Sequence, residues 1–286
     1  MEIVDSVFNI SEDFMKKPIY VKIDPLKILQ VVELMKETGF KKFDYDEKMR
    51  SDPKEVTKVI YLELVGNAIN YCYWYGRHDI RPSGSSSRLM YKLLVESFDR
   101  FGVFSKLLID NYISKLVEHR FPLLEDRVRH LYEIVDGQGN KFVRMISSSR
   151  EHIGVLFETL SKWFPGYGSD IFLKRVSLFF IQLNRNFGWY EQDIYSLPIP
   201  ADYQIPKMLR YYKCIVYSDK LQDKIDNHEL IPKHSLMECE IRAATVLVSK
   251  RLSELTGWSV SDVDSWFWLR RNECKDPFHL TITTDY

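Results

Sequence analysis

The sequence predicts a mostly α-helical protein with few short strands, folded as a single globular domain over residues 1–286. Capping signals followed by apolar residues at helical spacing recur along the chain, whereas the alternation typical of strands is sparse. Hydrophobic residues make up 45% of the 286 residues and aromatic residues 14%. This composition favours a large packed core over disorder.

The first expected helices begin after capping aspartates. Asp24 and Asp52 each precede a proline, which is favoured at the first position of a helix. The second of these helices should continue through the apolar stretch at residues 59–72. Residues 88–119 should form one or two amphipathic helices, with a break near Gly102.

The last third of the chain predicts one long helix and one short one. Ser235 and Glu238 have the spacing of a capping box, and the helix that they open should stop at Gly257. A short helix rich in tryptophan should begin at Ser261.

Two segments are candidate strands, and one segment is a clear loop. Residues 141–146 follow a glycine-containing turn, and residues 279–286 are rich in threonine and alternate in polarity. Residues 81–87 combine proline, glycine and serine, so they predict a surface linker or a lid over a ligand.

The charge balance bears on the class of partner. Lysine plus arginine and aspartate plus glutamate number 40 each, so the formal net charge is zero. Proteins that track DNA usually carry a basic surplus, so we expect no DNA partner; a small phosphorylated ligand remains compatible.

The cysteines and the first residues bear on location. The four cysteines are scattered without a C-x-x-C pair, which predicts reduced thiols, no metal site and no cofactor held by them. The first residues lack a signal-peptide pattern, and no apolar run is long enough to span a bilayer. We therefore expect a cytoplasmic protein, monomeric and without a membrane partner.

A candidate site begins with a glycine hairpin at residues 164–170. A helix that is apolar nearly all round follows it and still carries Lys174 and Arg175, and an isolated carboxylate, Asp202, comes next. Buried cations need partners, and a rigidly placed carboxylate suggests a role. This order of hairpin, helix and aspartate resembles the helix-hairpin-helix base-excision glycosylases over about 50 residues.

A longer resemblance runs along most of the chain. Six short blocks occur in order, at residues 67–76, 172–183, 201–210, 238–246, 262–269 and 277–286. Together they resemble the queuosine salvage family of queuosine 5'-phosphate N-glycosylases. The resemblance implies a mostly α fold related to the DNA glycosylases and the release of queuine from queuosine 5'-monophosphate.

The chemistry that the resemblance implies assigns the catalytic role to Asp202. A carboxylate near C1' stabilises an oxocarbenium-like sugar and can orient or deprotonate water. The alternative is that Asp202 only caps a helix. Lys174 is the first candidate contact for the 5'-phosphate and Arg175 the second, since adjacent helical residues point in different directions. A surface lysine is the alternative for Lys174.

The remaining candidate substrate contacts each have a structural alternative. Tyr203 and the aromatic group of Tyr71, Tyr73 and Trp74 can stack on the base, with core packing as the alternative for that group. Asn70 can bind a base or sugar edge, or satisfy backbone groups. Glu240 can meet the amine or diol of the side arm of queuine, or form a salt bridge. Asp264 and His279 are weaker candidates, and His279 could bind phosphate or be structural.

Three functions remain open at this point. The first is a soluble N-glycosylase for a modified nucleotide, with no cofactor and a small-molecule nucleotide as its substrate. The second is a DNA base-excision glycosylase, which the neutral charge disfavours. The third is a non-catalytic nucleotide- or RNA-binding module.

Overall fold

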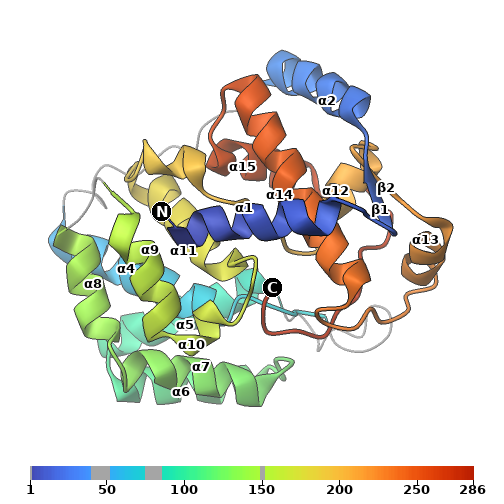
Figure 1. The fold of residues 1–286 in the computed structure, drawn as a ribbon. Coiled ribbons are helices and arrows are strands. Elements are labelled where there is room, and N and C mark those ends of the chain that lie inside the picture. Colours follow the sequence, from blue (N-terminus) through green and yellow to red (C-terminus); the bar gives the residue numbers. More distant parts are fainter. Residues whose placement is uncertain (1, 40–51, 75–85, 149–151) are drawn as a thin grey trace. The chain divides into compact units, whose positions relative to one another are not determined.

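The computed structural model describes residues 2–39, 52–74, 86–148 and 152–286 (Figure 1). These residues are mostly helical, and the sheet they form has two short strands. The prediction of a mostly α fold is confirmed. The chain groups into two compact units, and a single domain over the whole chain stays a prediction. Unit 1 comprises residues 1–43, 171–177 and 191–282, and unit 2 comprises residues 44–170, 178–190 and 283–286.

Unit 1 is built around the long helix α14 (Leu236–Thr256), which is buried along most of its length. Helix α1 (Glu2–Met15) crosses α14 and packs against it, and α2 (Pro25–Thr38) also contacts α14 (Figure 1). The Ser235 side chain accepts a hydrogen bond from the Glu238 amide, and Gly257 ends the helix with a left-handed φ of 73°. Both ends of α14 therefore lie where the sequence predicts them.

The other elements of unit 1 surround α14. Strand β1 (Val21–Ile23) pairs antiparallel with β2 (Ile215–Tyr217), with Lys22 opposite Val216. Strands of three residues are too short to show alternation, so the sequence did not reveal them. The remaining elements are the 3-10 helix η1 (Asp193–Ser196), α12 (Gln204–Tyr211), α13 (Asp219–Asp226) and α15 (Val260–Arg270).

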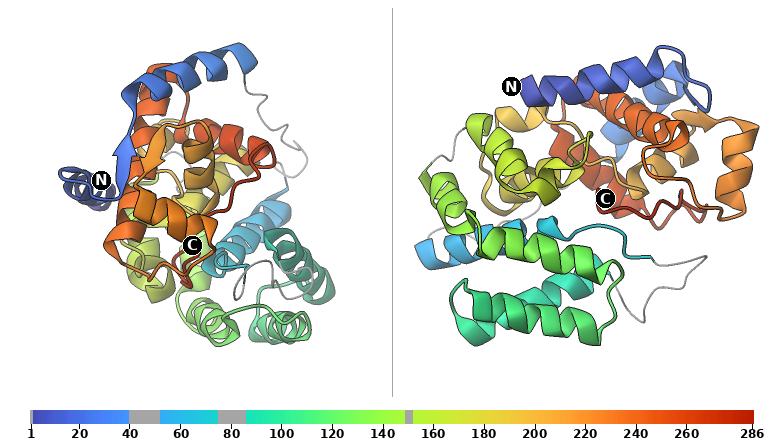
Figure 2. Two further views of the ribbon diagram at one scale, coloured as in Figure 1. Left: turned by 90° about the vertical axis from the view of Figure 1, so that its right-hand side faces the viewer. Right: turned by 60° about the horizontal axis from the view of Figure 1, so that its bottom comes forward.

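Among the described residues of unit 2, helices are the regular secondary structure, and loops join them. Its helices are α4 (Pro53–Ala68), α5 (Ser87–Phe101), α6 (Lys106–Glu118), α7 (Leu124–Val135), α8 (Gly139–Ser148), α9 (Gly154–Trp163) and α10 (Pro165–Gly168). Neighbouring pairs pack together, α5 on α6 and α6 on α7, while α4 contacts α5, α7 and α8 (Figure 2). Helix α11 (Lys174–Phe187) belongs to unit 1 up to residue 177 and to unit 2 from residue 178.

Most predicted helix ends are confirmed. Asp24 accepts hydrogen bonds from the amides of Leu26 and Lys27 at the start of α2. Asp52 accepts one from Lys54 at the start of α4, and Gly102 separates α5 from α6 with a φ of 71°. Local capping chemistry therefore sets these boundaries.

Four predictions of local structure are corrected. Residues 141–146 lie in α8, because their apolar members Phe142, Val143 and Ile146 form the buried face of a helix. Residues 279–286 form no strand; one isolated bridge joins Leu280 to Leu230. Helix α4 ends at Ala68, so residues 69–72 are not helical, and α15 starts after a capping box formed by Ser259 and Asp262, ahead of Ser261.

The glycine hairpin is one helical turn, α10, in unit 2. The Gly166 amide donates a hydrogen bond to Glu133 Oε2 at 2.8 Å, so that amide is engaged by the protein itself. A Cβ on Gly166 would lie 2.5 Å from the His130 ring, and one on Gly168 would lie 2.2 Å from the carbonyl oxygen of Ser161. Close packing explains both glycines, as a scaffold role requires.

Two further expectations concern cysteines and membranes. None of the four cysteines, all of which the structure describes, is in a disulfide, and all four are buried. Among the described residues, no helix combines the length and the apolar character that a membrane span would require. Of the loop predicted at residues 81–87, the part up to residue 85 lies outside the described residues, and Ser86 caps α5.

Candidate functional site

Asp202 lies in unit 1, two residues before the first residue of α12. Its Oδ1 accepts hydrogen bonds from the amides of Gln204 at 2.7 Å and Ile205 at 3.2 Å. Pro206 is the third residue of α12, where the missing amide hydrogen leaves no helical bond unmade. No described residue donates a hydrogen bond to Oδ2 of Asp202. The carboxylate is thus anchored through one oxygen, and the other oxygen can serve a second purpose.

Two charged side chains act on the Asp202 carboxylate. Burial raises the pKa of Asp202 above its ordinary value, and the charge of Asp264 raises it further. The charge of Lys174 and the hydrogen bonds from the α12 amides oppose this rise. Lys174 is 3% exposed at the start of α11, and Asp264 is 7% exposed on α15. Unit 1 therefore brings three of the predicted residues into one electrostatic environment.

An aromatic pair lies next to Asp202 in the sequence, since Tyr203 is the residue that follows it. The Tyr203 ring stacks on Phe278, with centroids 4.5 Å apart and planes at 29°. Both side chains are partly exposed. The pair thus forms a platform of the kind on which a base can stack. Phe278 was not singled out from the sequence, although it lies in the last of the six blocks.

His279 follows Phe278 and is 2% exposed. Burial lowers the pKa of His279 to about 3, and the nearby charge of Arg242 contributes to this. The imidazole is therefore neutral near pH 7 and supplies no positive charge to a phosphate. It can still donate or accept a hydrogen bond through its ring nitrogens.

Arg242, which the sequence analysis did not select, holds the backbone beside Asp202. Its Nε donates to the carbonyl oxygen of Ala201 at 2.9 Å, and its Nη1 lies 3.4 Å from Glu238 Oε1. The guanidinium also covers the Phe172 ring at 4.5 Å. The spacing of Glu238 and Arg242, four residues apart on α14, was a signal for the ion pair. The bond to Ala201 had no local signal.

Glu240 and Arg175 are also in unit 1 and fully buried. The Glu240 carboxylate accepts hydrogen bonds from the amides of Ile19, Tyr20 and Val21, at 2.9, 2.6 and 3.0 Å. Glu240 therefore anchors the start of β1, which is a structural role. A substrate contact for either residue stays a prediction.

Asn70 and Trp74 lie in unit 2. The Asn70 amide donates to Asn67 Oδ1 at 3.3 Å, and Asn70 Oδ1 accepts from the Tyr73 hydroxyl at 3.0 Å. Asn70 is partly exposed, whereas Trp74 is 3% exposed. A substrate contact for Asn70 or Trp74 stays a prediction.

Core packing accounts for the other aromatic residues of this block. The Arg127 guanidinium lies 4.5 Å from the Tyr71 ring centroid and donates to the Tyr71 carbonyl oxygen at 2.6 Å. Tyr71 and Tyr73 are both buried. Core packing, the structural alternative for this aromatic group, therefore describes Tyr71 and Tyr73.

Comparison with known proteins identifies the family. The model of the family described as queuosine salvage protein matches residues 50–275. The chain belongs to the queuosine salvage protein family. The matched range includes Lys174, Asp202 and Asp264 and ends before His279. The resemblance of the six sequence blocks to the queuosine salvage family is thereby confirmed.

Relatives in this family come from distant organisms. A protein of Dictyostelium discoideum is 26% identical over 304 residues, covering 96% of this chain and 90% of its own. One from Sphaerobacter thermophilus is 26% identical and covers 78% of this chain and 80% of its own. One from Mus musculus is 28% identical and covers 47% and 46%. Each is named queuosine 5'-phosphate N-glycosylase/hydrolase.

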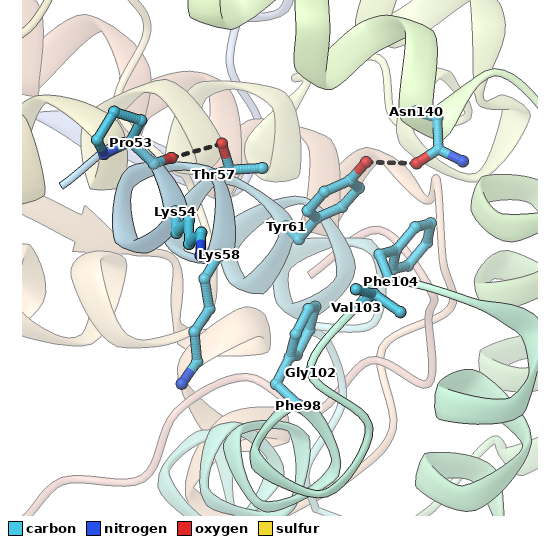
Figure 3. Close-up of a pocket in the computed structure, with 10 residues that line it drawn as sticks. All are labelled: Pro53, Lys54, Thr57, Lys58, Tyr61, Phe98, Gly102, Val103, Phe104 and Asn140. Carbon is cyan, nitrogen blue, oxygen red and sulfur yellow. Dashed lines mark hydrogen bonds between the residues drawn. The ribbon is translucent and has the colours of Figure 1, made fainter.

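A separate pocket in unit 2 has a volume of about 730 Å³ (Figure 3). Tyr61 stacks on Phe104 with centroids 4.4 Å apart, and Figure 3 shows its hydroxyl directed at Asn140. Lys58, which also lines the pocket, pairs with Asp99 at 2.7 Å. The described residues of its lining include no acid, histidine or cysteine, so none of them offers a group that glycosidic hydrolysis needs. Among the described residues, no set of three or more potential ligands could hold a metal ion.

Proposed function

We propose that this protein hydrolyses the N-glycosidic bond of queuosine 5'-phosphate and releases queuine for salvage into tRNA modification. The observation that carries the proposal is the match to the Dictyostelium discoideum protein, which is named queuosine 5'-phosphate N-glycosylase/hydrolase. The match extends over 96% of this chain. Membership of the family and a carboxylate site in unit 1 support it further.

Asp202 is the catalytic carboxylate in this proposal. Cleavage of the bond develops positive charge on the sugar, which a carboxylate near C1' stabilises. Two backbone amides hold Oδ1, so Oδ2 is the oxygen that would face C1' or orient the attacking water. Lys174 lowers the pKa of Asp202 against the effect of burial, which favours the ionised form that this role requires.

The other unit 1 residues would hold the substrate. Lys174 would bind the 5'-phosphate as a compact cation. Tyr203, supported from behind by Phe278, would stack on the base. Queuine is a 7-deazapurine without an N7 to protonate, so hydrogen bonds must stabilise the departing base, and neutral His279 is one candidate donor.

The test is release of the free base. The protein is incubated with queuosine 5'-monophosphate, and queuine is measured by mass spectrometry, with GMP and unphosphorylated queuosine as control substrates. Wild-type protein should release queuine from queuosine 5'-monophosphate faster than from unphosphorylated queuosine, because Lys174 would bind the phosphate. Loss of the Asp202 carboxylate should reduce release from both. If folded wild-type protein releases none, the proposed function is wrong.

A matched variant separates catalysis from helix capping. Asp24 caps α2 through two amides, as Asp202 does at α12, but lies outside the proposed site. Asp24→Asn should keep its activity, whereas Asp202→Asn should lose at least about a hundredfold, the usual scale of acid–base catalysis. An active Asp202→Asn protein would refute the catalytic assignment.

We further propose that the enzyme acts in the cytoplasm as a monomer on a free nucleotide, without DNA. Four cysteines outside any disulfide support a cytoplasmic location, and the zero net charge supports the lack of a DNA partner. Light scattering after gel filtration tests the monomer. An electrophoretic shift of duplex DNA at low salt would contradict the expected lack of DNA binding.

A further inference from the structure

Gln204, which has none of the roles proposed above, has a buried side-chain oxygen and lies two residues after Asp202. It is the first residue of α12, and its backbone amide donates to Asp202 Oδ1 at 2.7 Å. Its side-chain oxygen Oε1 is buried and has no hydrogen-bond partner among the described residues. Buried amide oxygens are nearly always hydrogen-bonded in folded proteins, so this one calls for a partner that the described residues do not supply.

Other buried oxygens in the described residues also lack a partner, but none has this position. They are the hydroxyls of Ser177, Ser218, Ser249 and Thr281. A hydroxyl can rotate, and it can donate as well as accept, whereas the oxygen of a carboxamide only accepts. Gln204 is also the only residue of this set that is hydrogen-bonded to Asp202.

The position limits which donor of the substrate can reach this oxygen. Asp202 must lie near C1' to stabilise positive charge on the sugar, so Gln204 lies near that end of the ribose. The three atoms bonded to C1' are the ring oxygen, the base nitrogen and C2'. The ring oxygen and the substituted nitrogen have no hydrogen to donate. The hydroxyl on C2' is therefore the donor nearest to the reacting carbon, and the N–H groups of the base lie further away.

We propose that Oε1 of Gln204 accepts a hydrogen bond from the ribose 2'-hydroxyl of the substrate and makes the enzyme selective for ribonucleotides. This inference rests on the proposed function. Hydrogen bonds to the hydroxyl next to the reacting carbon strengthen as positive charge develops in glycoside hydrolysis. A site built to pair a hydroxyl also discriminates against the analogue that lacks it, because its own polar group is then left unpaired.

The test compares two substrates across four proteins. kcat/KM is measured for queuosine 5'-phosphate and its 2'-deoxy analogue with wild type, Gln204→Met, Gln204→Glu and Ser249→Ala. The readout is the ratio of the two kcat/KM values, because the intrinsic difference in lability between the two glycosidic bonds cancels between proteins. Ser249 is a matched control, since it too has a buried unpaired oxygen.

Gln204→Met should lower the ribo-to-deoxy ratio by about tenfold, the scale of one hydrogen bond. Gln204→Glu keeps an acceptor and should retain most of the ratio, and Ser249→Ala should leave the ratio unchanged. The melting temperature of Gln204→Met should not fall, because the change removes an unpaired acceptor.

An equal loss of kcat/KM on both substrates with Gln204→Met would overturn the inference. The inference would also be wrong if Gln204→Met left the ratio of kcat/KM for the ribo and 2'-deoxy substrates unchanged and instead changed the ratio for the ribo substrate and a 3'-deoxy analogue. Absence of queuine with wild type would be a failure of the proposed function and not of this contact. The contact is then tested by the affinities of the Asp202→Asn protein and the Asp202→Asn/Gln204→Met protein for the ribo and deoxy nucleotides. The same tenfold change in their ratio supports it, and an unchanged ratio refutes it.

Discussion

Replacing Glu240 tests whether its side chain is a structural anchor or a substrate contact. Its two carboxylate oxygens accept hydrogen bonds from three backbone amides. Oε1 accepts from Ile19, and Oε2 accepts from Tyr20 and Val21. In Glu240→Gln, an amide oxygen in place of Oε2 keeps two of these bonds. The amide nitrogen then faces the Ile19 N–H, and two donors meet.

The magnitude follows from the number and burial of these bonds. A hydrogen bond to a charged group contributes about 1.5–3 kcal/mol, so Glu240→Gln should lower the free energy of unfolding by about 2–3 kcal/mol. Glu240→Ala loses all three bonds. Its effect should be about 3–5 kcal/mol, less than the simple sum, because Ile19 is 63% exposed and its amide can reach water.

The assay combines stability with kinetics. Urea unfolding should show the loss of free energy, and the melting temperature of Glu240→Gln should fall by about 4–10 °C. At a temperature where all proteins are folded, kcat/KM should stay within about twofold of wild type. Glu254→Gln is the control, because Glu254 lies on the same helix in an exposed pair with Arg251 at 3.2 Å. An exposed pair contributes at most about 1 kcal/mol.

The opposite pattern would refute this reasoning. If Glu240→Gln unfolds at the same urea concentration as wild type but raises KM at least tenfold, Glu240 binds the substrate. The three amides would then be satisfied in another way.

Three further predictions concern pH and packing. Lys174→Met removes a charge that lowers the pKa of Asp202, so the acidic limb of the pH profile of kcat/KM for unphosphorylated queuosine should move to higher pH. Asp264→Asn removes a charge that raises this pKa, so it should move the limb to lower pH. If both variants moved the limb in the same direction, the assigned charges would be wrong. The pKa of His279 is lowered to about 3, so the free energy of unfolding should fall as the pH drops from about 6.5 to 3, because the unfolded state binds the proton first. In urea unfolding curves measured over this pH range, His279→Gln should reduce the dependence of that free energy on pH. An unchanged dependence would show that His279 does not cause it. In Gly168→Ala the new Cβ would lie 2.2 Å from a backbone oxygen of α9, so the melting temperature should fall by several degrees; an unchanged value would show that α10 can shift without loss.

Helix boundaries could be predicted because their causes are local. The caps at Asp24, Asp52 and Ser235 involve residues at most three positions apart, and Gly257 adopts a backbone conformation that glycine favours. Residues 141–146 were misassigned, because a short apolar run satisfies a strand and a buried helix face equally well. Pairing of β1 with β2 joins distant segments and left no local pattern.

The site could be predicted only in part for the same reason. Asp202 before a proline-containing helix was visible in the sequence, and its capping bonds follow from that position. The bond from Arg242 to Ala201 joins residues 41 positions apart, so no spacing rule reveals it. The neutral state of His279 depends on burial, and the stack of Tyr203 on Phe278 depends on the tertiary fold.

The contact of Glu240 with residues 19–21 sets an order of events during protein synthesis. Helix α1 and strand β1 emerge from the ribosome early, but α14, against which α1 packs, is made more than 200 residues later. At about 5–20 residues per second, the apolar face of α1 waits on the order of 10–40 s for its partner. Val4 and Val7 on that face are exposed throughout this interval. The apolar face of α1 therefore lacks its native partner until the codons of α14 have been read.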